Sequence, residues 1–189
     1  MSEMFTINTE QDIAKKFEVQ PLPLYGEDYF MLRESMPEFD VSILPSEVTS
    51  KLIDRLKLTL KLYSGVGLSA NQCGVKARIF VMGSNDFSMT CINPTITKTY
   101  GELVKMNEGC LSSPGLYVKI PRYETIDVEY YDGTGNKITT MLEGVTAQCF
   151  QHELDHMNGV HFTKLAGDAS LLLARQRQTK LIKKMKKSM

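Results

Sequence analysis

The residue types best suited to chemistry in this chain are two histidines and a glutamate, in the segment His152-Glu153-Leu154-Asp155-His156. On a helix, a separation of four residues places both imidazoles on one face, within reach of one metal ion. Glu153 follows the first histidine, close enough to hydrogen-bond a water on that metal. Because the chain has three histidines in all, this spacing favours a hydrolytic metal centre over a helix that carries ordinary surface histidines.

A third metal ligand has to come from elsewhere, since hydrolytic centres usually have three protein ligands and one open position. His161 lies one residue short of the third histidine in the extended zinc-peptidase pattern, so we expect it to be structural. The sequence after Asp168 contains no glutamate that could serve as a downstream ligand. Cys110, upstream, offers a thiolate that would complete a mixed sulfur and nitrogen site for a divalent transition metal.

A segment with two glycines, Gly65-Val66-Gly67-Leu68-Ser69-Ala70-Asn71-Gln72, precedes both of these motifs. Glycine allows unusual backbone angles and the close approach of another backbone. The amide of Gln72 can donate an uncharged hydrogen bond to an oxyanion that forms during hydrolysis. Alone, the segment would predict only a tight turn after a helix. In company with the other two motifs, it is expected to be part of the site.

The elements that must position these residues follow from the apolar pattern. Ser46 is a suitable N-cap for a helix that ends before Gly65 and has apolar residues at helical spacing. These residues are Val48, Leu52, Leu56 and Leu60. Short strands are predicted over 78–82, 90–93 (ending at Pro94), 95–100 and 124–131.

The histidine segment is predicted to lie on a second helix over 144–158, closed by Gly159, and an exposed basic helix should follow from Asp168. Helices and strands are segregated along the chain, which favours an α+β fold. We expect antiparallel sheets around the central histidine helix, with an N-terminal helix and a C-terminal helix. The chain divides into an N-terminal extension over 1–20, a catalytic domain over 21–167 and a basic helix over 168–189.

Composition excludes several classes of partner. The formal net charge is zero, so general binding to DNA or to a membrane surface is not indicated. The chain has neither a secretory signal nor an apolar stretch long enough to span a membrane, and its four cysteines form no CxxC pair. Cys91 and Cys149 are expected to be buried hydrophobic residues. We therefore expect a cytoplasmic protein, or one from the interior of an organelle.

In order along the chain, the three motifs resemble the signature of the peptide deformylases: GxGLAAxQ, EGCLS and QHExxH. Here they read Gly65 to Gln72, Glu108 to Ser112 and Gln151 to His156, and the resemblance covers about residues 21–167. It implies the peptide deformylase fold. It also implies an enzyme that removes the formyl group from the N-terminal formylmethionine of newly made polypeptides.

The resemblance further implies a role for each motif. The metal ligands would be Cys110, His152 and His156. Glu153 would be the general base for a metal-bound water that attacks the formyl carbon, and would later protonate the leaving amine. Gln72 and the backbone N–H of Leu111 would stabilise the oxyanion. The metal in the cell would be Fe²⁺, while Zn²⁺, Ni²⁺ or Co²⁺ could occupy the same ligands in purified protein.

Substrate contacts are implied for four positions: Val66, Gly67, Gly109 and Tyr117. Gly67 would align the peptide in a strand-like way, and Val66 would line the pocket for the methionine side chain. Tyr117 stands where many bacterial members have arginine, which leaves the preference beyond methionine open. Ser69 replaces the first alanine of the glycine motif, a small change expected to leave the turn intact.

The partners implied are N-formylmethionyl nascent peptides and, through the C-terminal tail, the ribosome. From Arg175 onward the tail has basic residues and no acidic one. They are Arg175, Arg177, Lys180, Lys183, Lys184, Lys186 and Lys187. Such a tail suits electrostatic attachment to RNA, and equally suits a solvated helix with no partner.

Two other functions remain open at this point. A zinc peptidase with a different third ligand would cleave internal peptide bonds and would stay active after Cys110→Ala. A non-catalytic metal-binding module would have a fully coordinated metal and would be indifferent to Glu153→Ala. Against the second stands a glutamate beside a metal ligand, where a structural site has no use for it.

Overall fold

The structure is a computed structural model that describes residues 19–84 and 87–187. Nearly all of the extension predicted over 1–20 therefore lies outside the described residues. A single antiparallel sheet has the strand order β1-β2-β3-β4-β5. The strands are β1 (Gly67–Ser69), β2 (Ile79–Ser84), β3 (Phe87–Cys110), β4 (Ser113–Tyr131) and β5 (Lys137–Glu143).

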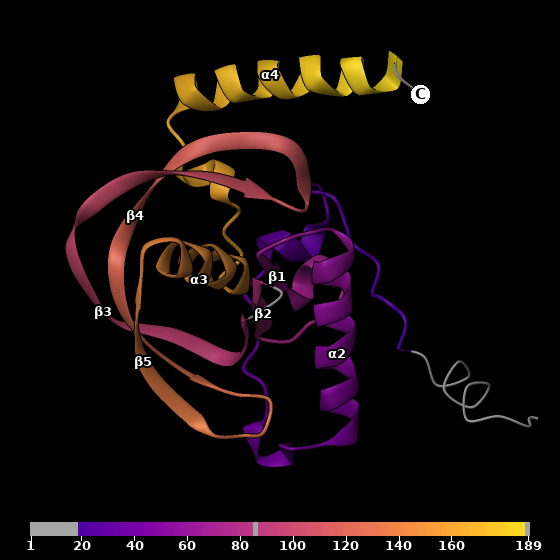
Figure 1. Ribbon diagram of the computed structural model, residues 1–189, viewed down its shortest axis with the longest axis vertical. Helices are drawn as coiled ribbons and strands as arrows, with labels where there is room; N and C mark the ends of the chain where they lie inside the picture. Colours follow the sequence, from indigo (N-terminus) through magenta and orange to yellow (C-terminus); the bar gives the residue numbers. More distant parts are fainter. Residues whose placement is uncertain (1–18, 85–86, 188–189) are drawn as a thin grey trace, which may run out of the picture.

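The α-helices of the described residues are α2 (Glu47–Leu62), α3 (Gly144–Met157) and α4 (Asp168–Lys187). Short 3₁₀ turns link them to the sheet: η1 (Phe30–Arg33), η2 (Val41–Ile43), η3 (Ala70–Cys73) and η4 (Phe162–Leu165). The long strands β3 and β4 curve around α3, while α2 lies on the far side of β1 and β2, as Figure 1 shows. The α+β fold with a central histidine helix is confirmed.

Strand β3 corrects the prediction of two short strands separated at Pro94, because it continues unbroken to Cys110. The ladder with β4 shifts register between Ile92 and Thr95, so Pro94 lies at an irregularity where its missing N–H breaks no regular pairing. Asn93, next to it, has a positive φ of 50°. The strand bends here and at later register shifts, which lets it wrap around α3.

Helix α2 begins as predicted, with the Ser46 hydroxyl accepting the Thr49 N–H at 3.2 Å. Of the four residues predicted to form its apolar face, only two are buried. Leu56 and Leu60 are buried, but the Val48 side chain is 80% exposed. A strict spacing of four drifts about 40° around a helix at each step, so such a series leaves the packed face. The residues that face the core are Thr49, Ile53, Leu56, Thr59 and Leu60.

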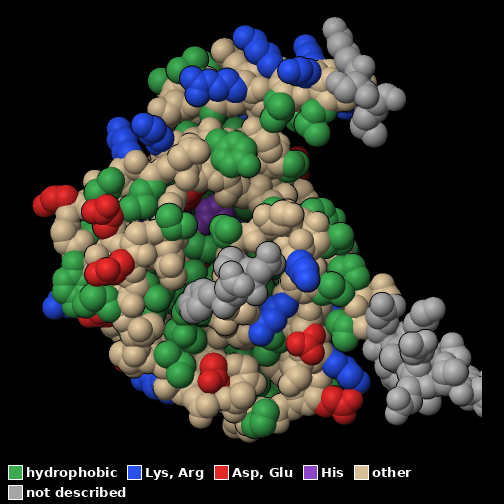
Figure 2. All heavy atoms as spheres, in the orientation of Figure 1, with side chains coloured by type: hydrophobic (Ala, Val, Ile, Leu, Met, Phe, Trp, Pro, Cys, Tyr) green, Lys and Arg blue, Asp and Glu red, His purple; other side chains and the backbone are tan. Residues whose placement is uncertain are grey.

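Helix α3 occupies the centre of the fold and ends as predicted, with Gly159 at φ 69°. Its buried residues include both histidines of the motif and Glu153. Helix α4 packs on β4 through the buried Ala174, and the Gln178 amide donates to the Pro114 carbonyl at 2.9 Å. Most of its basic side chains lie on the outside of the molecule (Figure 2), while Arg175 pairs with Glu27. None of the helices in the described part of the chain is long and apolar enough to cross a membrane.

Candidate metal centre

Three predicted ligands come together although they lie on two different elements. Cys110 ends strand β3, while His152 and His156 are one turn apart on α3. One ligand atom from each lies within 4.8 Å of the others, and Cys110 Sγ is 3.3 Å from His156 Nε2. His161 lies outside this group, because its ring nitrogens contact the hydroxyls of Ser113 (3.2 Å) and Thr163 (2.8 Å).

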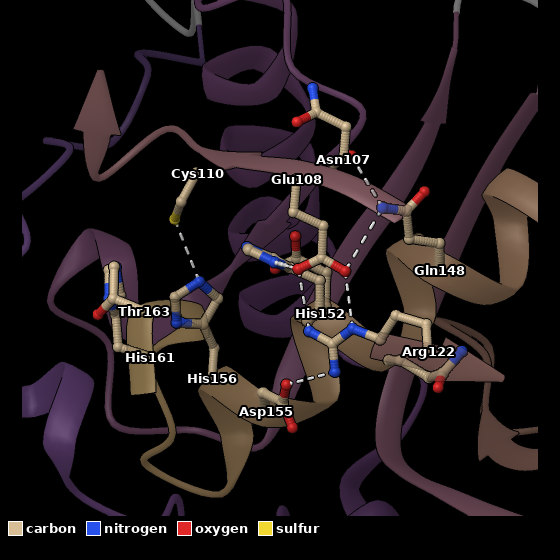
Figure 3. A network of polar contacts seen from close by, with 12 residues as sticks. Asn107, Glu108, Cys110, Arg122, Gln148, His152, Asp155, His156, His161 and Thr163 are labelled. Carbon is tan, nitrogen blue, oxygen red and sulfur yellow. Dashed lines mark hydrogen bonds and ion pairs between the residues drawn. The ribbon is translucent and has the colours of Figure 1, made fainter. Parts of the chain in front are cut away.

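Glu108 orients the first histidine. Its Oε2 lies 3.0 Å from His152 Nδ1, and its pKa falls to about 2 because hydrogen bonds from His152 and Arg122 outweigh the effect of burial. The carboxylate therefore stays ionised and accepts the Nδ1–H, which leaves His152 Nε2 to face Cys110 and His156 (Figure 3). Orientation of a ligating imidazole by a carboxylate is typical of metal sites.

Arg122 of β4 neutralises the acidic groups behind the histidines. Its guanidinium donates to both oxygens of Glu108, at 2.7 and 3.0 Å, and to Asp155 Oδ2 at 2.6 Å. The side chains of Arg122 and Glu108 are only 5% and 4% exposed. Because the paired charges satisfy one another, this buried network can hold its geometry without water.

The electrostatics of the ligand group favour a cation. Burial lowers the pKa of His152, but hydrogen bonds with Cys110 and Glu108 reverse this and raise it well above its ordinary value. These acidic partners favour a proton on His152, and a metal ion would replace that proton at Nε2. Burial also lowers the pKa of His156 well below its ordinary value, which keeps that imidazole neutral and able to ligate. One sulfur and two nitrogens suit a divalent transition metal, so the residues present fit such an ion.

Glu153, which follows His152 on α3, is held next to this group. Its Oε2 accepts a 2.6 Å hydrogen bond from the Ser69 hydroxyl, and its Oε1 lies against Gly67. Burial raises the pKa of Glu153, while the charge of His152 and the Ser69 hydrogen bond oppose that rise in part. A carboxylate with a raised pKa is suited to take up and release a proton near neutral pH.

Gln72 has one amide orientation imposed by its own turn. Its Oε1 accepts the Ser69 backbone N–H at 2.8 Å, which directs Nε2 toward Cys110 Sγ (3.3 Å) and the Ser112 hydroxyl (3.1 Å). The glycine motif thus contains a short edge strand, β1, followed by η3. It is not the tight turn after a helix that the segment alone would predict.

A cleft of about 670 Å³ opens over these groups. In Figure 2 a histidine is visible at the floor of a hollow bordered by hydrophobic side chains. All four residues predicted to contact substrate line this cleft, together with Leu111 in the turn between β3 and β4. Val66 and Tyr117 are 60% and 61% exposed at its edge. A side chain at Gly109 would come within 2.6 Å of the Tyr117 ring, so glycine lets that ring lie across the strand.

The sequence did not predict the roles of three residues that position the site. Glu108 belongs to a motif that was singled out, yet only the structure shows it on His152. No local pattern marks Arg122, because its partners are 14 and 33 residues away. Ser69 was expected to be neutral, but its hydroxyl contacts Glu153. Of the cysteines, Cys91 is buried as expected, while Cys149 is half-buried and lines the cleft.

A family model for polypeptide deformylase matches residues 20–170 of the chain. The chain belongs to the polypeptide deformylase family. This family is metal-dependent, in agreement with the Cys110, His152 and His156 group. The peptide deformylase of Thermotoga maritima is 38% identical over 141 residues, which cover 75% of this chain and 86% of the relative.

Solved deformylase structures share the fold. That of Synechococcus elongatus, in complex with actinonin, has a TM-score of 0.78 and 29% identity, with 95% of this chain and 94% of that one covered. A class I type b peptide deformylase from Acinetobacter baumannii, bound to Met-Ala-Ser, has a TM-score of 0.73 and 25% identity. Its match covers 78% of this chain and 99% of that chain.

Proposed function

We propose that this deformylase hydrolyses the formamide of N-formylmethionyl peptides with Glu153 as general base and with Cys110, His152 and His156 as the ligands of one divalent metal. The observation that carries the proposal is the convergence of the three ligand atoms within 4.8 Å, beside a buried carboxylate at the floor of a cleft. When bound there, the metal would polarise the formyl oxygen and lower the pKa of water.

The chain's own groups account for the proton transfers. Glu153 takes one proton from the attacking water as the new C–O bond forms. It then delivers that proton to the nitrogen as the C–N bond breaks, so water and formamide yield formic acid and a free amine, which become formate and an ammonium group when the acid proton moves to the amine. Gln72 Nε2 and the backbone N–H of Leu111 are assigned as donors to the oxyanion that forms between these steps. The locked amide of Gln72 supports its assignment, because a donor that needs no reorganisation stabilises best.

Peptide binding is assigned to the edge of the sheet. β1 is the terminal strand in the sheet order, so an extended peptide can pair beside Gly67. The methionine side chain would then enter the cleft past Val66, with Gly109 and Tyr117 on the opposite wall. Met-Ala-Ser in the Acinetobacter relative supports a peptide that begins with methionine as the product.

The finer assignments follow from chemistry. The thiolate and imidazole ligands are compatible with Fe²⁺, which we propose as the metal in the cell, and with Zn²⁺, Ni²⁺ or Co²⁺. The family match to residues 20–170 supports a catalytic domain over 21–167. For α4 we propose an attachment role on the ribosome, because the helix packs on β4 through Ala174 and leaves its lysines on the outside of the molecule. Newly made peptides would place the enzyme in the compartment of protein synthesis, the cytoplasm.

The direct test is release of formate from formyl-Met-Ala-Ser by protein loaded with Fe²⁺ or Ni²⁺. Formate should appear together with an equal amount of free Met-Ala-Ser, and acetyl-Met-Ala-Ser should be a poor substrate. Cleavage of the Met-Ala bond in place of formate release would point to a peptidase. Full metal occupancy with neither product would point to a binding module.

A further inference from the structure

Ser69 is the last residue of β1 and its side chain is fully buried. The hydroxyl oxygen lies 2.6 Å from Glu153 Oε2 and 3.3 Å from the Glu153 backbone carbonyl. Both of these oxygens accept, and a hydroxyl has one proton to donate. The shorter contact, to the charged group, therefore takes the proton. One oxygen of Glu153 is thus held by a hydrogen bond from a neighbouring strand.

Within residues 19–84 and 87–187, no hydrogen bond restrains the other oxygen of Glu153 in this way. Oε1 lies against the α-carbon of Gly67, a residue that lines the cleft. The two contacts divide the carboxylate into a restrained oxygen, Oε2, and an oxygen on the side of the cleft, Oε1. A carboxylate without the hydroxyl could rotate about its terminal torsion, which has a broad minimum.

Ser69 also fixes the side chain of Gln72, but it does so through its backbone N–H, which does not depend on the serine side chain. Its backbone N–H donates to Gln72 Oε1 at 2.8 Å. Alanine, which stands at this position in the deformylase signature, would keep that bond and lose the one to Glu153. The hydroxyl is an addition in this chain that contacts Glu153 and also forms a capping box with the Gln72 backbone N–H at the start of η3.

We propose that Ser69 is a positioning residue that keeps Oε2 of Glu153 occupied, so that the catalytic proton is taken up and returned by Oε1. The inference rests on the proposed function of Glu153 as general base. If only Oε1 takes up the proton, the proton lies on the side of the leaving nitrogen in every turnover. It would not be taken up by Oε2, which faces the protein interior. This orientation would raise turnover and leave peptide binding unchanged.

The test compares wild-type protein with Ser69→Ala, each with its metal content measured. We expect kcat for formyl-Met-Ala-Ser to fall about tenfold in Ser69→Ala, with KM and metal content within about twofold of wild type. Ser69→Cys, which keeps an atom in the place of the hydroxyl oxygen but is a weak donor, should resemble Ser69→Ala. Thr90→Val, which removes a buried hydroxyl from β3 outside the cleft, should leave kcat unchanged.

A double-mutant cycle separates this role from a structural one. In the Glu153→Gln background, Ser69→Ala should change the residual kcat by less than about twofold, because the base on which it acts is gone. A tenfold loss in both backgrounds, or a wild-type kcat in Ser69→Ala, would overturn the proposal. A wild-type protein that releases no formate would instead overturn the function on which the proposal rests.

Discussion

The carboxylate of Glu153 lies directly against the α-carbon of Gly67. A methyl group at Gly67 would overlap Glu153 Oε1 and lie 2.7 Å from Cys149 Sγ. The glycine that we assign to peptide alignment on β1 is therefore also the space in which the general base sits. In the proposed mechanism the substrate strand and the base would meet at this one residue, which would place the scissile group beside the group that transfers its proton.

Gly67→Ala is expected to displace Glu153 and lower kcat at least a hundredfold, because the added methyl has no free volume. Overpacking at such a position usually costs about 1–3 kcal/mol of folding stability. Gly167→Ala is the matched control, since a Cβ there meets nothing within 4 Å and its φ is not positive. The measurements are formate release and thermal unfolding of both variants. Near wild-type turnover in Gly67→Ala would contradict the close contact of Gly67 with Glu153.

Glu153→Gln should lower kcat by about a hundredfold to ten-thousandfold, the usual range for loss of a general acid–base group. The amide is isosteric and can still interact with Ser69, so the fold and the metal content should not change. Elemental analysis and formate release should be measured on the same preparation. Wild-type turnover by the metal-loaded variant would refute the role of Glu153.

Cys110→Ala removes the sulfur ligand and should release the metal or weaken its binding strongly, because two imidazoles remain. Metal content after dialysis against a chelator is the measurement, with formate release beside it. Cys91→Ala is the control, since Cys91 is a buried thiol of the same strand outside the ligand group. Retained metal and peptide-bond cleavage in Cys110→Ala would revive the zinc-peptidase alternative.

The pair of Glu27 and Arg175 joins α4 to the body, with contacts of 2.7 and 2.9 Å. Burial raises the pKa of Glu27, but hydrogen bonds from Arg175 and Ser113 and the charge of Arg175 bring it below 4.5, its ordinary value. Because the pKa is lower in the folded state, the stabilisation is complete above pH 4.5 and is lost as the pH falls further.

Glu27→Gln should accordingly cost about 1 kcal/mol of unfolding free energy at pH 7, and progressively less below pH 4.5. Urea unfolding at several pH values measures this difference. Glu47→Gln provides the control, because the Glu47 and Lys51 pair is exposed and should contribute almost nothing. A pH-independent difference for Glu27→Gln would show that the carboxylate charge is not what holds α4.

Tyr117→Arg should shift substrate preference. Tyr117 lines the cleft with an uncharged, exposed ring held over Gly109. Arginine there should raise kcat/KM for formyl-Met peptides with an acidic residue after methionine by about fivefold relative to neutral ones, through a screened charge contact. A series with Glu, Ala or Lys after methionine is the measurement. An unchanged ranking would remove Tyr117 from the substrate contacts.

The sequence by itself predicted the ligands and the base that we propose, and it contained the family signature. His152 and His156 are one helical turn apart, so their common face follows from helix geometry alone. The helix boundaries of α2 and α3 were equally readable, because an N-cap serine and a terminal glycine act on their own turns.

Only the tertiary structure decided what these residues touch. The contact of Glu108 with His152 spans 44 residues and that of Ser69 with Glu153 spans 84. Strand β3 can continue through Pro94 because its register against β4 shifts there. Which residues of α2 are buried depends on the position of the sheet against which the helix packs. The periodic pattern of apolar residues reflects interactions between neighbours within one helical turn or one strand. The partners of a buried charge are chosen by the packing of distant segments, which no local pattern encodes.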